Sequence, residues 1–397
     1  MNFDILGFEM KKLSVSQRSR LLLTAKRRAL NKSRRRMTKI ARTLDVARLR
    51  IERAKFARAN NIPFDPDLAR QQIVMPRVLS FQKNYEETAA ALIELRDAVL
   101  MDNRSAMLHF EHVDQIDPSA ALAIVAEVYR CRNLRPIRNG HSVSGSYPEN
   151  IEIHTLLKDM GFYKLLYVDP TDRPSHSVNI DRPIYLKFLT GTNVDAELIN
   201  DFVELIEKNQ ILEFSDLARA RLVEAILEAM GNADEHAYKS PTKRPAMKRR
   251  WFLSASVHLR NHEVTVMLYD QGIGIPSTID ISAFDRFVIQ AEDHKWFEIF
   301  RNKPNDGVLI KAATELFRSG TRQSGRGRGF RNMKRLIDHC EDGSLMVLSN
   351  FGHYSYVKDR EAIGKSKEAF DSNQSSLEGT LLEWTFKSET PVVMNDE

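Results

Sequence analysis

The order of the predicted helices and strands constrains this chain most, because that order changes at a Pro- and Ser-rich stretch, residues 169–183. Before this stretch, apolar runs with strand character alternate with helical runs, which is typical of a small α/β unit. After it, helices and antiparallel strands occur in blocks. This pattern predicts an α+β fold in which helices cover one face of a mixed, mostly antiparallel sheet.

The individual elements follow from the periodicity of the apolar residues. Before the boundary we expect strands at 74–81 and 106–113, and helices at 88–100, 118–132 and 153–166. After it we expect helices at 193–210 and 215–240, and strands at 251–260, 263–272, 345–350, 353–358 and 380–386. The predicted organisation is a basic helical arm at 1–60, a small α/β domain at 75–168, a linker at 169–194 and a larger domain at 195–388.

The arm is set apart by its charge. Between Lys11 and Arg58 the chain has 18 Lys and Arg and two acidic residues, so this stretch carries +16 and the rest −10, against a total of +6. No Pro or Gly interrupts it, so we expect a helix. A narrow apolar seam follows the helical period: Met37, Ile40, Leu44, Ala47, Ile51 and Ala54. Two interpretations of 11–58 stay open: the cations contact a nucleic acid or another polyanion, or the seam packs on the body or on a second copy.

Other features limit the class of protein. No run of about 18 apolar residues occurs, so we expect no membrane-spanning segment. The N-terminus has two acidic residues before its first base, a poor match to a signal peptide. Cys131 and Cys340 lie in apolar helical contexts, which predicts two buried free thiols. These features favour a cytoplasmic protein.

A polar stripe runs along the helix expected at 215–240. Glu228, Asn232 and His236 are spaced by four, so they share one face and drift by about 40° per step. Such a stripe on an amphipathic helix ordinarily faces solvent. Gly231, however, costs about 1 kcal/mol in a helix. We therefore expect something to approach the helix closely at this point.

Two glycine-containing stretches come later in the chain. A predicted strand ends at Asp270, with Gly272 and Gly274 after it. A carboxylate at a buried strand end needs donors, and glycines permit close approach of backbone and ligand. Farther on, a helix is expected to begin after Gly325, Gly327 and Gly329, with Arg322, Arg326 and Arg328 beside them, a setting that favours phosphate. An RG-type RNA contact is the alternative for this second stretch.

These elements, in this order, resemble the boxes of the GHKL ATPase superfamily, which includes gyrase, a heat-shock chaperone, histidine kinases and mismatch-repair ATPases. The resemblance covers about 195–388, includes Gly379-Thr380 on the last strand, and is nearest to the anti-sigma-factor serine kinases in "NADEHAYKS" and "GRGRGFRNMKRLID". It implies a GHKL-type two-layer α/β sandwich with an ATP lid at 277–324. This lid is longer than those kinases have, and it contains helical stretches at 282–300 and 306–317.

The resemblance also implies roles for single residues, with ATP and Mg²⁺ as cofactors. Glu228 would be the general base, and Asn232 the protein ligand of Mg²⁺. Asp270 would accept a hydrogen bond from adenine, with Gly272 and Gly274 shaping the pocket. The phosphates would be held by Gly325, Gly327, Arg328 and Gly329, and Thr380 would hold a water or the base edge. His236 is expected to pack or to support its neighbours.

Residues 75–168 resemble the STAS domain of anti-sigma-factor antagonists around "HVDQIDPSAALAIVAEV". Those antagonists carry a phosphorylatable Ser directly after an Asp, whereas here Pro118 follows Asp117 and Ser119 comes next. The alternative is structural: Asp117 is a helix N-cap and Pro118 a first-turn residue.

Three functions are compatible with these motifs. The first is an ATPase that acts as a conformational switch with a signalling or regulatory output, favoured by the long lid and the basic arm. The second is a serine/threonine protein kinase of the anti-sigma-factor type, favoured by the motif wording and the STAS-like neighbour. The third is a nucleotide-sensing adaptor without turnover, against which Glu228 argues. A protein partner is expected, and the seam and the superfamily are compatible with a homodimer.

Overall fold

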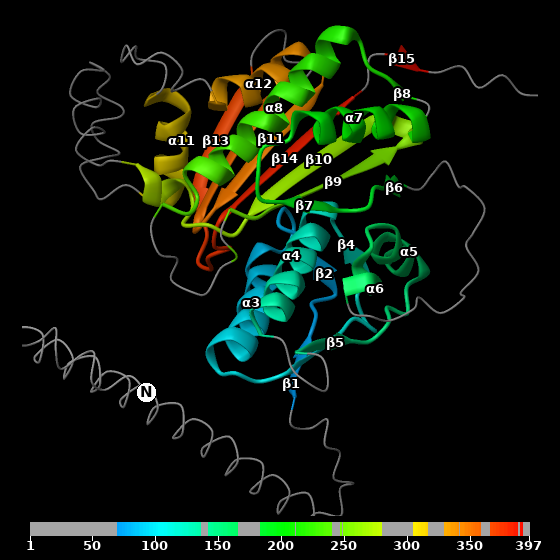
Figure 1. Ribbon diagram of the computed structural model, residues 1–397, viewed down its shortest axis with the longest axis vertical. Coiled ribbons are helices and arrows are strands. Elements are labelled where there is room, and N and C mark those ends of the chain that lie inside the picture. Colours follow the sequence, from blue (N-terminus) through cyan, green and yellow to red (C-terminus); the bar gives the residue numbers. More distant parts are fainter. Residues whose placement is uncertain are drawn as a thin grey trace, which may run out of the picture. The chain divides into compact units, whose positions relative to one another are not determined.

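We describe a computed structural model of the chain, in which residues 70–397 form one compact unit. The structure describes residues 70–135, 142–165, 183–210, 212–239, 247, 249–279, 305–316, 329–340, 342–358, 366–387 and 390–391. The predicted basic helix and its seam lie outside the described residues, as do 280–304 and 317–324 of the predicted lid. The described part is mixed α+β, with helices and a largely antiparallel sheet (Figure 1).

A single eight-stranded sheet forms the larger, C-terminal lobe, residues 183–391. Its strand order is β13-β12-β11-β14-β10-β9-β6, and β7 also pairs with β9. Every pairing in this sheet is antiparallel among the described residues. The strands span Pro183–Tyr185 (β6), Leu189–Gly191 (β7), Trp251–His258 (β9), Glu263–Asp270 (β10), Gly343–Ser349 (β11), Gly352–Lys358 (β12), Lys367–Ser372 (β13) and Thr380–Lys387 (β14).

Four helices cover one face of this sheet, which we call the helical face. They are α7 (Ala196–Gln210), α8 (Asp216–Glu235), α11 (Asp306–Leu316) and α12 (Gly329–His339). Their apolar sides share one core with alternate residues of the strands, such as Val264, Val266 and Leu268 of β10. The short strands β8 (Leu212–Glu213) and β15 (Thr390–Pro391) pair with each other beside this layer.

The smaller, N-terminal lobe, residues 70–165, contains two sets of parallel strands. β1 (Gln71–Val74), β3 (Ala106–His109) and β5 (Val143–Gly145) form one set, and β2 (Val78–Leu79) pairs with β4 (Gln115–Ile116). The helices are α3 (Tyr85–Arg96), which continues as a π-helical turn to Met101, α4 (Pro118–Leu134), α5 (Ile151–Asp159) and α6 (Phe162–Leu165). The alternation of strand and helix predicted for this region is confirmed.

The N-terminal lobe packs on the second face of the sheet, which we call the lobe face. Helix α4 lies against β9 and β10, and its residues from Ser119 to Val128 are buried on all sides. Phe252, Met267 and Tyr269 point from the sheet into the core of the N-terminal lobe. The sheet is thus covered on both faces. The sequence predicted two separate domains, and it did not predict that the smaller one packs on the sheet of the larger one.

Two predicted boundaries differ from the structure. Strands β6 and β7 belong to the large sheet although they fall within the predicted linker 169–194. Helix α11 falls within the predicted lid, yet Val308, Ile310 and Ala312 are buried against the sheet. The strands β6 and β7 were missed because they are short. The helix at 306–317 was predicted, but its packing on the sheet was not.

Two smaller expectations agree with the structure. Among the described residues, no helix is both long and apolar enough to cross a membrane. Within the described residues, Cys131 and Cys340 form no disulfide, and both are buried.

Candidate functional site

Helix α8 presents the polar stripe found in the sequence. The helix begins after Ser215, whose hydroxyl oxygen accepts a hydrogen bond from the Ala218 amide at 3.2 Å. Glu228 and Asn232 are half-buried on α8, whereas the opposite face is fully buried in the core of the helical face. His236 is the C-cap residue, and its ring lies 2.9 Å from the Lys239 ammonium. Glu228 and Asn232 therefore share one face of α8, as predicted, and are partly shielded from solvent, whereas His236 lies just beyond the last helical residue.

Three polar residues meet at one end of the sheet, on neighbouring strands. Asp270 of β10 pairs in register with Thr380 of β14, and Thr380 pairs with Ser349 of β11. By strand alternation all three lie on the helical face with Leu268, Leu382 and Val347. The Ser349 and Thr380 hydroxyls are 3.0 Å apart. Sheet pairing thus brings together two residues predicted from sequence and one that was not.

Asp270 is a buried carboxylate with few donors. Its side chain is 5% exposed, and among the described residues its hydrogen-bond donor is the Gly272 amide at 2.8 Å. Burial raises the pKa of Asp270 to about 7, and the hydrogen bond from Gly272 opposes this rise. A group in this state gains from a further donor, because the charged form lacks the hydration that it has in water.

The glycines after Asp270 have structural reasons of their own. A methyl group on Gly272 would come within 2.3 Å of the Ala237 carbonyl oxygen, because the chain leaving α8 crosses the strand end here. The Ile273 amide donates to that same carbonyl at 2.7 Å. Gly274 has a φ of +79° and lies against the Asn350 side chain. Protein packing therefore explains these two glycines without a ligand.

Gly231 of α8 behaves differently. A methyl group at this position would meet no described atom within 4 Å. Within the described residues, then, nothing approaches Gly231 closely, although its cost in a helix predicted such an approach. The space beside it, between Glu228 and Asn232 in sequence, is open to a molecule from outside the described chain.

Helix α12 brings a further polar side chain to the stripe. Asn332 is buried, and its amide nitrogen donates to a Glu228 carboxylate oxygen at 3.4 Å. Arg335 donates to the Asn332 carbonyl oxygen at 3.2 Å, which orients the amide group toward Glu228. The helix expected after Gly329 is α12, and Gly329 is its first residue, while Gly325, Gly327 and Arg328 lie outside the described residues.

Sequence reasoning missed Ser349 and Asn332. Ser349 is fully buried, accepts from the Ile275 amide at 2.8 Å and donates to the Gly379 carbonyl at 2.9 Å. Its only signal was a hydroxyl at the end of an apolar strand, which is common. Asn332 could have been found as a polar residue at the edge of the apolar face of α12, beside Leu336 around the helix.

Asn232 and Asp270 are the polar groups with which the site could hold a cofactor. No group of three or more His, Cys, Asp or Glu in the described residues could hold a metal ion. A single amide such as Asn232 can still contribute to a Mg²⁺ that is held mainly by phosphate oxygens and waters. The buried, donor-poor Asp270 fits an amine-bearing base.

Ser119, the residue compared with the phosphorylatable Ser of the antagonists, is buried. It is 1% exposed at the start of α4 and hydrogen-bonds with Glu383 of β14, where the two lobes meet. Asp117 is in the N-cap position, but its side chain does not cap the helix and instead accepts from Gln115 at 3.3 Å. The structural interpretation of Pro118 as a first-turn residue is confirmed.

Comparisons with known proteins add no assignment, since the sequence matches no family model and a search of the curated proteins finds no match.

Proposed function

We propose that this chain is a Mg²⁺-dependent ATP-binding protein of the GHKL type that hydrolyses ATP slowly, as a conformational switch with a signalling or regulatory output. Asp270 carries the proposal. It is a buried carboxylate at a strand end, with a pKa raised by burial to about 7 and the Gly272 amide as donor. The exocyclic amine of adenine is a donor that such a carboxylate accepts from.

The residues around Asp270 support the same proposal. Glu228 and Asn232 lie on α8 over the same face of the sheet, and α12 packs beside α8. In the proposal Glu228 polarises a water as general base, while Asn332 holds the carboxylate in place. Thr380 holds a water or the base edge, and Gly329 with Gly325, Gly327 and Arg328 holds the phosphates. Mg²⁺, bound through Asn232, would neutralise charge on the phosphate oxygens.

The N-terminal lobe supports a switch over phosphorylation within the chain. We propose that this lobe is STAS-like, from its parallel strands and the turn before α4. Ser119 is buried at the junction of the lobes against Glu383. A phosphate there would bring like charges together and could form only after the lobes separated. The kinase alternative therefore needs a substrate on another protein, and the basic arm at 11–58 stays a candidate for a polyanion or protein partner.

The test is incubation of the full chain with Mg²⁺ and γ-labelled ATP, following both free phosphate and label on protein. Glu228→Ala is compared with Glu224→Ala, a matched control one turn away that removes a carboxylate paired with Arg221 at 2.7 Å. Phosphate release that is lost in Glu228→Ala and kept in Glu224→Ala supports the switch. Label on a Ser or Thr of an added protein supports the kinase, and binding without either product supports the adaptor. Absence of ATP binding to the unaltered chain overturns the proposal.

A further inference from the structure

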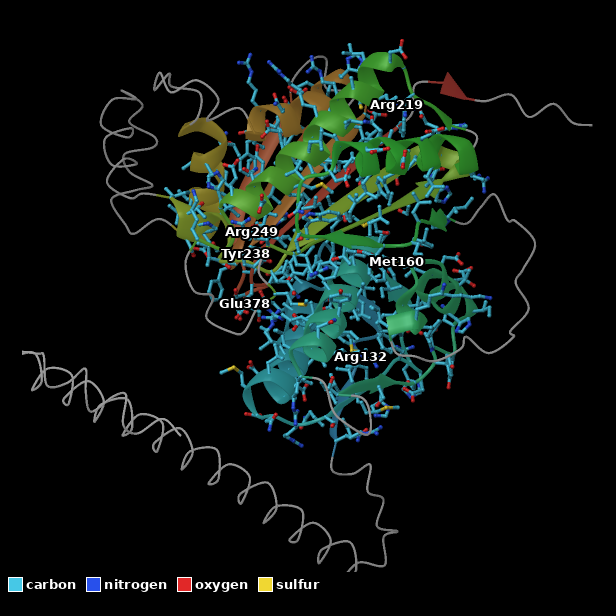
Figure 2. All side chains as sticks on the ribbon, viewed as in Figure 1. Arg132, Met160, Arg219, Tyr238, Arg249 and Glu378 are labelled. Carbon is cyan, nitrogen blue, oxygen red and sulfur yellow. The ribbon has the colours of Figure 1, made fainter. Side chains whose placement is uncertain are left out.

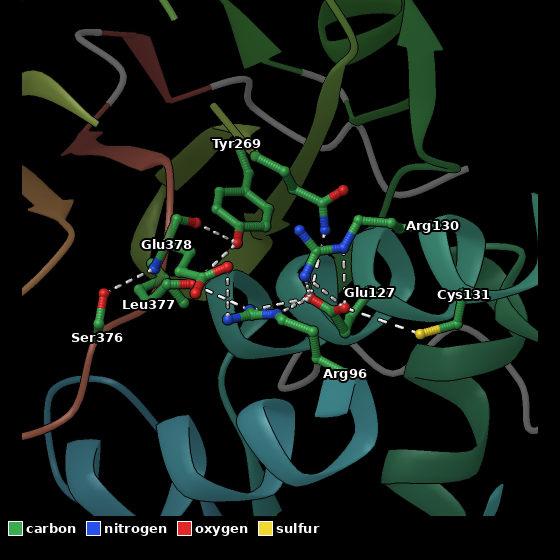
Figure 3. A network of polar contacts seen from close by, with 9 residues as sticks. Arg96, Glu127, Arg130, Cys131, Tyr269, Ser376, Leu377 and Glu378 are labelled. Carbon is green, nitrogen blue, oxygen red and sulfur yellow. Dashed lines mark hydrogen bonds and ion pairs between the residues drawn. The ribbon is translucent and has the colours of Figure 1, made fainter. Parts of the chain in front are cut away.

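A buried ion cluster lies where the two lobes meet, near the end of the sheet that carries Asp270 (Figure 3). At its centre is Glu127 of α4, which is 1% exposed. Arg130 donates to both carboxylate oxygens, at 2.7 and 2.9 Å, and Arg96 of α3 donates at 3.0 and 3.2 Å. Burial alone would raise the pKa of Glu127, but the two arginines outweigh it and the pKa is lowered. The carboxylate is thus held charged and fixed.

The cluster reaches into the C-terminal lobe by two routes. Arg96 donates to the Leu377 carbonyl at 3.1 Å and pairs with the Glu378 carboxylate at 3.1 Å. Gln271, which is 2% exposed, donates from its side-chain amide to Glu127 at 3.4 Å. Figure 2 labels Glu378 and Tyr238 at this end of the sheet. The Tyr238 hydroxyl oxygen accepts a hydrogen bond from the backbone amide of Gln271 at 3.2 Å.

Both routes end beside residues of the candidate site. Gln271 directly follows Asp270, and Glu378 lies two residues before Thr380. The turn from Glu378 to Thr380 packs closely against the end of β10. A methyl group on Gly379 would lie 2.0 Å from the Asp270 carbonyl oxygen. The Tyr269 hydroxyl ties the same turn to β10 by donating to the Glu378 carbonyl at 2.8 Å. The contacts of the cluster therefore enter the C-terminal lobe next to Asp270 and Thr380.

We infer that Gln271, Glu127 and Arg96 are positioning residues for the base-binding end of the site, so that the N-terminal lobe sets the affinity and selectivity for the base. The inference rests on the proposed function, because it assigns Asp270 to the base. Gln271 links a fixed, charged carboxylate to the residue after Asp270. Loss of that link leaves the arginine pairs of Glu127 in place but frees the Asp270–Gly272 segment to shift. A shift of about 1 Å is enough to weaken a hydrogen bond.

The experiment compares Gln271→Met with Gln82→Met in the full chain. Gln82 is the matched control, because its amide also crosses the junction of the lobes, donating to the buried Glu383 carboxylate at 3.1 Å. Two nucleotides are titrated, ATP and inosine triphosphate, which has a carbonyl where adenine has its amine. Hydrogen exchange of the amides of Gly272 and Thr380 is measured in the nucleotide-free protein, beside thermal unfolding.

We expect Gln271→Met to weaken ATP binding about tenfold, a change of ~1.4 kcal/mol, with little change for inosine triphosphate. Gln82→Met should leave the ratio of the two affinities as it is in the unaltered chain. Equal losses for both nucleotides, or equal effects of the two variants, would mean that the contact only stabilises the junction and would overturn the inference. If the unaltered chain binds neither nucleotide, the proposed function is wrong. Hydrogen exchange at the Gly272 amide then tests, without nucleotide, whether Gln271 positions the Asp270–Gly272 segment. Faster exchange at Gly272 in Gln271→Met alone supports it, and unchanged exchange overturns it.

Discussion

Glu127 and Asp270 are both buried carboxylates near the junction of the lobes, and their surroundings are opposite. Glu127 receives hydrogen bonds from two arginines and from Gln271, whereas Asp270 receives one from the Gly272 amide among the described residues. The pKa of Glu127 is lowered although burial raises it, because Arg130 and Arg96 favour the charged form. The pKa of Asp270 is raised by burial to about 7.

In the function proposed above, this difference separates a structural group, Glu127, from a binding group, Asp270. A carboxylate with its donors already in place holds parts of the protein together and has little left to offer a ligand. A buried carboxylate short of donors is costly to the fold, and such cost is kept where a ligand supplies what is missing. Four predictions test the contrast.

The largest effect is expected at Glu127, the carboxylate that already has its hydrogen-bond donors. Replacing Arg96 by Met removes one partner and leaves Glu127 and Glu378 short of a cation inside the junction. Breaking a buried pair in this way costs about 3–5 kcal/mol of unfolding free energy. Urea denaturation measures it. The control is Arg77→Met, which breaks the exposed pair with Asp114 and should leave the unfolding free energy almost unchanged, because solvent screens that pair. Equal losses in the two variants would contradict the structural role of Glu127.

A second effect is expected in the pH dependence of stability. Because the folded-state pKa of Asp270 is raised from 3.8 to about 7, the folded protein holds a proton that the unfolded chain has lost between these values. Asp270 alone should therefore lower stability by up to roughly 4 kcal/mol as pH rises from about 4 to 7, at ~1.4 kcal/mol per pH unit. Asp270→Asn should remove this contribution.

Glu383 supplies the control for that slope. Burial raises its pKa to about 7 as well, while hydrogen bonds from Ser119 and Gln82 oppose the rise. Glu383 should add a fall of its own as pH rises from about 4.5 to 7, and Glu383→Gln should remove it. Denaturation of both variants at pH 5 and pH 8 gives the result, and an unchanged slope in Asp270→Asn would show that Asp270 is not buried as described.

A third effect concerns binding. Asp270→Asn puts an amide donor or a weaker acceptor opposite the adenine amine, and a hydrogen bond to a charged group contributes about 1.5–3 kcal/mol. We expect ATP affinity to fall by about 30-fold at pH 8, measured by calorimetry. Inosine triphosphate should bind Asp270→Asn at least as well as the unaltered chain. An unchanged ATP affinity in Asp270→Asn would mean that Asp270 does not contact the base.

The smallest effect is expected at Gly231. Gly231→Ala should raise the unfolding free energy by about 1 kcal/mol, because alanine favours the helix and nothing described lies within 4 Å. If the open space is used by nucleotide, the same variant should bind ATP less tightly. Gain of stability with unchanged binding would place the nucleotide elsewhere.

Much of the fold could be predicted because long elements carry clear periods. The strands β9, β10, β11 and β14 and the helices α7 and α8 were found within a few residues of their bounds. β6, β7 and β13 were missed, since they are three to six residues long and contain polar or exposed positions. The packing of α4 on the sheet had a signal that was not used: a helix that is apolar on all sides is buried between layers.

The candidate site was predictable only in part. Glu228, Asn232, Asp270 and Thr380 stood out by spacing or by their place at an element boundary. The meeting of Asp270, Thr380 and Ser349 depends on strand register, which no local pattern specifies. The contacts of Gln271 and Glu378 with the other lobe depend on packing between segments far apart in sequence.

The Arg96–Leu377 contact joins residues 281 positions apart. It therefore cannot form until nearly the whole chain has been synthesised. During synthesis, Arg96 and Glu127 leave the ribosome long before Glu378 and β14 exist. Until then the N-terminal lobe lacks the sheet face that fills its core, and it exposes Arg96 and apolar residues of α4. Contacts of such long range form late and slowly. The half-made chain therefore has a period of exposure in which a chaperone would protect it, and a truncation before residue 377 should leave the N-terminal lobe prone to aggregation.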